Sequence, residues 1–122
     1  MKESGEKVLP SIYLDDIYRN LKDFGMMLKN YEKYTPDDFE NLKNTYLTLM
    51  RTDINRLNGI INENPNANQN PVLRLCKILL HKLESQLEDL DSYEILLSNK
   101  LNKIIPDFRR SLRKLSNIFS NL

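Results

Sequence analysis

The stretch CKILLHKLESQLEDL, residues 76–90, decides the fold class of this chain. Its apolar side chains recur three or four residues apart, which places them on one face of an α-helix. The same spacing occurs before and after this stretch. The recurring positions are Leu14, Ile17, Leu21, Phe24, Leu28, Tyr31, then Phe39, Leu42, Tyr46, Leu49, then Leu97, Leu101, Ile104, Phe108, Leu112, Leu115, Phe119 and Leu122. The pattern predicts an all-α protein, folded as an antiparallel bundle of four main helices.

Length and composition agree with one small folded domain. The chain has 122 residues, of which 40% are apolar and 29% charged, as is usual for soluble helical proteins. The net charge of +1 gives no global attraction to nucleic acid. The single cysteine, Cys76, excludes an intramolecular disulfide and favours an intracellular location, in the cytoplasm or nucleus. No apolar run approaches the roughly 18 residues of a membrane span, so none is expected.

Turn and capping residues predict the domain boundaries. Residues 1–8 are polar and are expected to form a flexible N-terminal segment, before a single helical domain over 9–122. A first helix should run from Pro10 to about Tyr34. Thr35-Pro36-Asp37-Asp38 combines a capping threonine, a first-turn proline and acids that favour the positive helix end, and predicts a second helix to about Ile61. The asparagine-rich and proline-containing segment 62–71 should be an exposed loop.

The third helical region, residues 72–105, allows two interpretations. Its start is apolar nearly all round, which predicts a deeply buried first turn. Asp91-Ser92-Tyr93-Glu94 resembles a capping box, so the region could break near residue 90 and give five helices. Because the apolar seam keeps its phase across this point, one continuous helix is the favoured interpretation. Pro106 should end it, and a last helix should follow over 107–120.

The residues of catalytic and metal sites are scarce in this chain. Zinc sites usually recruit several cysteines or histidines, and only Cys76 and His81 are present. The glycines Gly5, Gly25 and Gly59 are isolated and form no phosphate-binding loop. A phosphorelay role for His81 is one functional hypothesis, but the small residues that admit a phosphoryl group in such domains do not follow this histidine. We therefore expect no catalytic residues, no cofactor, no metal and no enzymatic activity.

The distribution of charge along the chain indicates a candidate binding site. Residues 84–99 contain five acids and no base, whereas residues 100–122 contain six bases and one acid. An apolar row that an isolated bundle could leave partly uncovered lies beside these bases. The candidate partner-binding residues are Lys103, Arg109, Arg110, Arg113 and Lys114. Such a helix can bind an acidic protein, nucleic-acid phosphates or an anionic membrane surface, or can simply present a solvated basic face.

Two short segments resemble the helical domain of the GINS replication-complex subunits. Thr35-Pro36-Asp37-Asp38-Phe39-Glu40 is similar to a Pro-acidic-Asp-Phe helix start in that family, and residues 97–104 are similar to a later Leu-x-x-Arg-x-x-Lys-Ile helix. The arginine of the second segment is missing here, and the family's small β domain has no counterpart. The resemblance implies a subunit of a multiprotein assembly.

These observations predict a non-enzymatic protein–protein interaction module, either a helical adaptor or a small subunit of a larger complex. The expected partner is another protein or a second copy of the chain. The alternative is a nucleic-acid-associated subunit, for example of a replication complex, that binds through the basic C-terminal helix.

Overall fold

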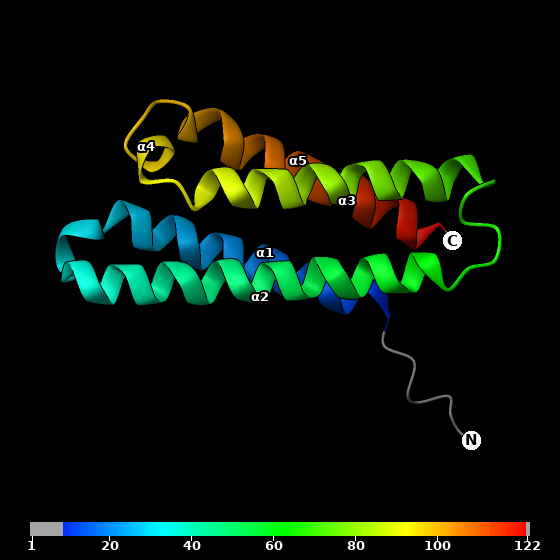
Figure 1. The fold of residues 1–122 in the computed structure, drawn as a ribbon, viewed down its shortest axis with the longest axis horizontal. Coiled ribbons are helices and arrows are strands. Elements are labelled where there is room, and N and C mark those ends of the chain that lie inside the picture. The colour runs from blue at the N-terminus through cyan, green and yellow to red at the C-terminus, as the bar shows by residue number, and fades with distance from the viewer. Residues whose placement is uncertain (1–8, 122) are drawn as a thin grey trace, which may run out of the picture.

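Four long helices form the bundle that the sequence predicted. The computed structural model describes residues 9–121, and the expected flexible segment 1–8 lies outside them. The helices are α1 (Pro10–Lys29), α2 (Pro36–Asn62), α3 (Pro71–Leu90), the short α4 (Tyr93–Leu96) and α5 (Leu101–Ser120), with a 3₁₀ turn, η2, over Tyr31–Lys33. Successive long helices run antiparallel, and α1 and α2 lie below α3 and α5 in Figure 1. None of the described helices is long and apolar enough to cross a membrane.

The predicted start of α2 is confirmed by its cap. The backbone N–H of Asp38 donates to the Thr35 hydroxyl at 3.1 Å, and Pro36 occupies the first helical turn. The predicted end of the first helix is wrong. α1 stops at Lys29 because Asn30 caps it, with its side-chain amide donating to the Met26 carbonyl at 2.9 Å. The chain then turns through η2 before Thr35 begins the next helix.

The favoured interpretation of residues 72–105 as one continuous helix is wrong. α3 ends at Leu90, and the chain bends through α4 before α5 begins at Leu101. The break is held by Lys43 of α2, which is only 2% exposed. Its ammonium donates to the Asp91 carbonyl at 3.2 Å and pairs with the Asp91 carboxylate at 2.9 Å. The alternative interpretation, a break near residue 90, is confirmed. The capping box suggested for it does not form, because Asp91 bonds to Lys43 and Ser92 makes no side-chain cap.

Pro106 does not end a helix. It lies inside α5, which continues from Leu101 through to Ser120. Proline has no N–H to donate to the carbonyl four residues earlier, here that of Asn102, so this part of α5 lacks one helical hydrogen bond. Two half-buried isoleucines, Ile104 and Ile105, pack against the core just before the proline. Their burial explains why α5 begins earlier than the proline suggested.

The core follows the predicted apolar seams of α1, α3 and α5, but on α2 the predicted Leu49 is 44% exposed and the neighbouring Met50 is buried instead. Leu21, Phe24, Leu80, Leu83 and Leu87 are predicted to be buried, and each is at most 2% exposed. They belong to one cluster to which α1, α2, α3 and α5 all contribute.

The first turns of α3 differ from the expectation of deep burial. Val72, Leu75 and Ile78 are 43%, 46% and 65% exposed, because only the opposite side of α3 faces the bundle.

The connection between α2 and α3 is more ordered than a simple exposed loop. Most of its side chains are exposed, but Ala67 is only 5% exposed and belongs to the core cluster. The Asn70 side chain caps α3, accepting from the N–H groups of Val72 at 2.8 Å and Leu73 at 3.3 Å. This loop therefore helps to start α3.

Cys76 provides a prediction about reactivity. It is fully buried, and burial raises the pKa of its thiol. Since the thiolate is the reactive form, we expect a thiol reagent to label the native protein far more slowly than the protein unfolded in denaturant. Labelling followed by mass spectrometry measures this. Equal rates in the two conditions would show that the start of α3 opens readily.

Candidate functional site

The five basic residues predicted to bind a partner are all exposed on α5. The apolar row beside them is covered rather than open, because Phe108, Leu112 and Leu115 are 0% exposed. The expectation that an isolated bundle leaves this row partly uncovered therefore fails for its main part. The buried part of this row is therefore closed to a partner, and the part of α5 from Phe108 to Leu115 offers only its charged side.

The bundle places four of the five cations on two sides of α5. Lys103 and Arg110 line a hollow together with Gln86 of α3. There Asp107 pairs with Arg110 at 3.1 Å and with Lys82 of α3 at 2.9 Å, so part of the positive charge is neutralised. Lys114 lines none of the hollows described for this part of the molecule.

Arg109 and Arg113 lie on the side of α5 that faces α1. Burial raises the pKa of Tyr18 of α1, and the nearby charges of Arg113 and Arg109 partly offset that rise. Arg109 also lines two hollows together with Lys22 of α1. Within residues 9–121, no carboxylate lies within ion-pair distance of Arg109, Arg113 or Lys22. This side of α5 therefore keeps its positive charge.

A groove with basic borders runs between α1 and α5. Its middle part has a volume of about 510 Å³ and a floor that includes Leu21, Ile105 and Pro106. Three cations, Lys22, Lys29 and Arg109, line it, and its lining contains no acid. We name this part the basic groove. It combines apolar surface with unpaired positive charge, and both helices contribute to each.

An apolar pocket lies next to the basic groove, at the end of the bundle where α4 sits above the turn from α1 to α2 (Figure 1). Its volume is about 550 Å³, and no charged residue lines it. We name it the end pocket. Its aromatic and apolar walls include Tyr31, Tyr34, Phe39, Tyr93, Leu96 and Leu97.

Long-range contacts shape the end pocket. The rings of Phe39 and Tyr93 lie 6.4 Å apart, and the Lys43 ammonium sits 4.3 Å from the centre of the Tyr93 ring. Lys43 thus holds α4 through both its charge and a cation–π contact. Leu97, at the rim, is 86% exposed.

Sequence reasoning missed the end pocket. The helix pattern assigned Tyr31 and Leu97 to the apolar seams of two different helical regions, yet they are 57% and 86% exposed. A signal was present in the clustering of tyrosines around turns, with Tyr31 and Tyr34 before one helix start and Tyr93 near another. Aromatic residues beside turns are candidates for exposed recognition surfaces.

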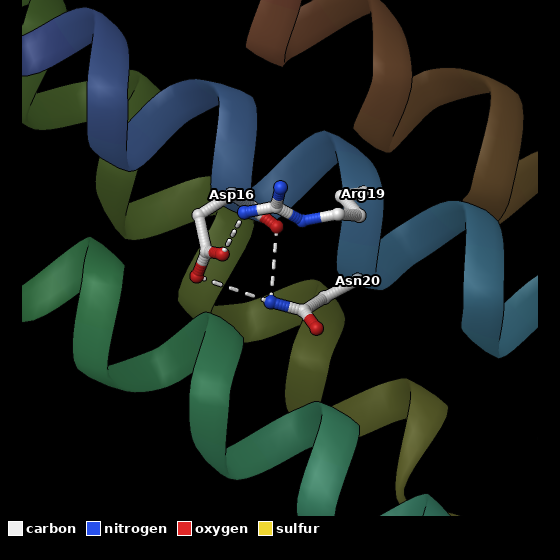
Figure 2. Close-up of polar contacts among 3 residues, drawn as sticks. All are labelled: Asp16, Arg19 and Asn20. Atoms are coloured by element: carbon white, nitrogen blue, oxygen red, sulfur yellow. Dashed lines mark hydrogen bonds and ion pairs between the residues drawn. The ribbon is translucent and has the colours of Figure 1, made fainter.

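A polar cluster lies on α1 at its boundary with α2. Asp16 accepts from Arg19 at 2.6 Å and from the Asn20 side chain at 3.2 Å, and Asn20 also donates to the Asp16 carbonyl at 2.9 Å (Figure 2). Asp53 of α2 faces this cluster and is 8% exposed. One of its carboxyl oxygens has no hydrogen-bond partner among the described residues.

The pKa values of the two carboxyl groups in this cluster are shifted in opposite directions. Burial and the adjacent Asp16 raise the pKa of Asp53 to about 7. Hydrogen bonds from Asp53 and Arg19 lower the pKa of Asp16. A protonated Asp53 that donates to an ionised Asp16 fits both shifts. Neither residue lines any of the hollows described above, so we interpret the pair as a link between two helices.

The other candidate reactive residues lie apart from these sites. His81 is exposed on α3 and Cys76 is buried in the core. Over residues 9–121, no group of three or more histidine, cysteine or acidic side chains is placed to hold a metal ion.

Comparison of the chain with protein-family models, with curated proteins and with solved structures finds no match. The resemblance of two short segments to GINS subunits receives no support from these comparisons. The functional proposal therefore rests on the geometry of the molecule.

Proposed function

We propose that this chain is a non-enzymatic protein–protein interaction module, an adaptor or a small subunit of a multiprotein complex. It binds through the side of α5 that faces α1. The observation that supports this most is the basic groove, where Arg109 and Lys22 border an apolar floor and have no acidic partner among the described residues. Arginine is common at the centres of protein interfaces, because its planar guanidinium pairs with carboxylates while its stem packs on apolar surface.

A nucleic-acid-associated subunit is the second candidate, favoured by the exposed cations of α5. Tyr18 adds to it, because this half-buried aromatic side chain lies near Arg109 and Arg113 although it comes from α1. Bases stack on such rings in single-strand binding sites. The apolar floor of the basic groove favours the protein partner, since a phosphate backbone gains nothing from it.

Reversing two charges tests the proposal. Arg109→Glu combined with Arg113→Glu should leave the fold intact, because both side chains are exposed and surface substitutions usually change stability by less than about 0.5 kcal/mol. Binding to the proteins recovered with the wild-type chain from cells should fall at least about tenfold, the effect of roughly 1.4 kcal/mol in binding free energy. Quantitative mass spectrometry of the recovered proteins measures this.

The matched control is Arg56→Glu combined with Arg74→Glu, which changes the net charge equally but on exposed positions of α2 and α3. This control should keep its partners. If the Arg109 and Arg113 variant also keeps every partner, the binding face lies elsewhere and the proposal is wrong. If the bound partner is DNA or RNA, log affinity against log salt should be steep for the wild type and shallower by about one per lost phosphate contact, which would favour the second candidate.

A further inference from the structure

The end pocket and the basic groove are parts of one longer groove. Leu28 and Leu101 line both of them. The basic groove in turn shares Lys22 and Arg109 with a third hollow, of about 620 Å³, which lies beside Tyr18. The three hollows therefore follow the α1–α5 boundary without interruption.

Chemical character changes along this groove. The end pocket is lined by aromatic and aliphatic side chains and contains no charge. The middle is lined by three cations and no acid, and the third hollow contains Arg19, Lys22 and Arg109 with a single acid, Asp15. Arg19 is already paired with Asp16 at 2.6 Å. The unpaired positive charge of the groove is therefore carried by Lys22, Lys29 and Arg109, on one side of the end pocket.

We propose that this groove binds one amphipathic segment of a partner protein, with apolar side chains in the end pocket and carboxylates beside Lys22 and Arg109. This inference rests on the proposed function and names the partner's chemistry. Tyr18 and Leu28 are separated by about 15 Å along α1, at 1.5 Å per residue. The bound segment is thus a helix of about three turns or an extended stretch of about five residues.

The other possible occupants fit the groove less well. A nucleic-acid strand needs positive charge along its whole path, and the end pocket has none. A second copy of the chain would have to insert a segment that carries both acids and exposed apolar groups. In α3 the exposed apolar residues Val72, Leu75 and Ile78 lie at the opposite end from the acids Glu88 and Asp89. Exposed Tyr93 and Leu97 do flank the acid Glu94, but both already form walls of the end pocket.

A displayed library of random 12-residue peptides tests the proposal without knowledge of the partner. Selection on the whole protein should enrich peptides that combine two or more large apolar residues with two or more acids. Fluorescein-labelled synthetic copies then give dissociation constants by fluorescence anisotropy. Replacing the acids of a selected peptide by glutamine should weaken its binding at least about tenfold.

Two protein variants locate the bound peptide. Leu97→Asp at the rim of the end pocket should weaken binding at least about tenfold, and so should Arg109→Glu with Arg113→Glu. Leu97 is 86% exposed, so this change leaves the core untouched. The matched control is Ile78→Asp, since Ile78 is 65% exposed but lies on α3 away from the groove. It should bind the peptide as the wild type does.

Several outcomes would overturn the inference. It is wrong if no peptide is enriched, if the enriched peptides lack acids, or if Leu97→Asp binds them normally. It is also wrong if Leu97→Asp instead dissociates an oligomer of the pure protein, or if a single-stranded oligonucleotide displaces the peptides from the groove. Loss of cellular partners on reversing Arg109 and Arg113, with unchanged peptide binding by Leu97→Asp, would leave the proposed function standing and exclude only this occupant.

Discussion

Leu83→Ala should lower the free energy of unfolding by about 2–5 kcal/mol. Leu83 is 0% exposed and lies in the core cluster of the bundle. The substitution removes buried methyl groups and leaves a cavity that closely packed neighbours cannot fill completely. Urea denaturation followed by circular dichroism measures the loss, provided that the slope of the transition is unchanged.

Leu97→Ala is the matched control, because it removes the same atoms from a side chain that is 86% exposed. It should change the free energy of unfolding by less than about 0.5 kcal/mol. A loss below about 0.5 kcal/mol for Leu83→Ala as well would mean that the register of α3 in the bundle is incorrect.

Asp53→Asn should stabilise the protein at pH 8 and have little effect at pH 4. In the folded chain the pKa of Asp53 is raised from 3.8 to about 7, chiefly by burial and then by Asp16. Because the folded protein holds this proton more tightly than the unfolded chain does, the proton stabilises the fold fully below pH 3.8. That stabilisation is lost progressively as the pH rises from 3.8 to about 7. Above pH 7 the wild type must keep two carboxylates together at the α1–α2 boundary, whereas asparagine stays neutral.

The expected gain at pH 8 is on the order of 1–3 kcal/mol, with the difference between variant and wild type growing from about pH 4 to pH 8. Urea denaturation at several pH values measures it. Asp23→Asn, which removes an exposed carboxylate from α1, controls for the change in net charge. A difference between Asp53→Asn and wild type that stays constant with pH would show that Asp53 does not hold a proton in the folded protein.

Local sequence signals predicted the parts of this fold that depend on neighbours in the chain. The apolar period defined the buried faces of α1, α3 and α5, because burying one side of a helix requires that spacing. In the first half of α2 it was displaced by one residue, since the predicted Leu49 is 44% exposed whereas Leu47 and Met50 are buried. Thr35 and Pro36 predicted the start of α2 to the residue, because a cap is formed by groups only three residues apart. These features require no knowledge of the rest of the molecule.

The features that sequence reasoning missed depend on distant contacts. The chain breaks after Leu90, where Asp91 meets Lys43, a residue 48 positions earlier. The seam across residues 91–100 keeps its helical phase, yet Leu97 on that seam is 86% exposed. Periodicity alone cannot distinguish a buried leucine from one at the rim of a pocket.

The candidate site was predicted in part. The charge pattern selected Arg109 and Arg113, which the fold brings towards α1. It also selected Lys103 and Arg110, which the fold places beside α3, where Asp107 pairs with Arg110. Lys22 and the aromatic walls of the end pocket were missed, because they meet the groove only when α1, α2, α4 and α5 assemble.

The short helix α4 gives the end pocket one wall that is easily moved. α4 has four residues and none of them is fully buried. It is held by Leu96, which packs against the core, by the Phe39–Tyr93 ring contact, and by the contacts of Lys43 with Asp91 and Tyr93. Segments with few buried contacts open locally at free energies far below that of global unfolding. A bound segment that needs more room can therefore displace α4 while the rest of the bundle stays folded. Ordering α4 again around the bound segment carries an entropic penalty. This penalty favours short-lived complexes with segments of differing size over one long-lived, exclusive complex.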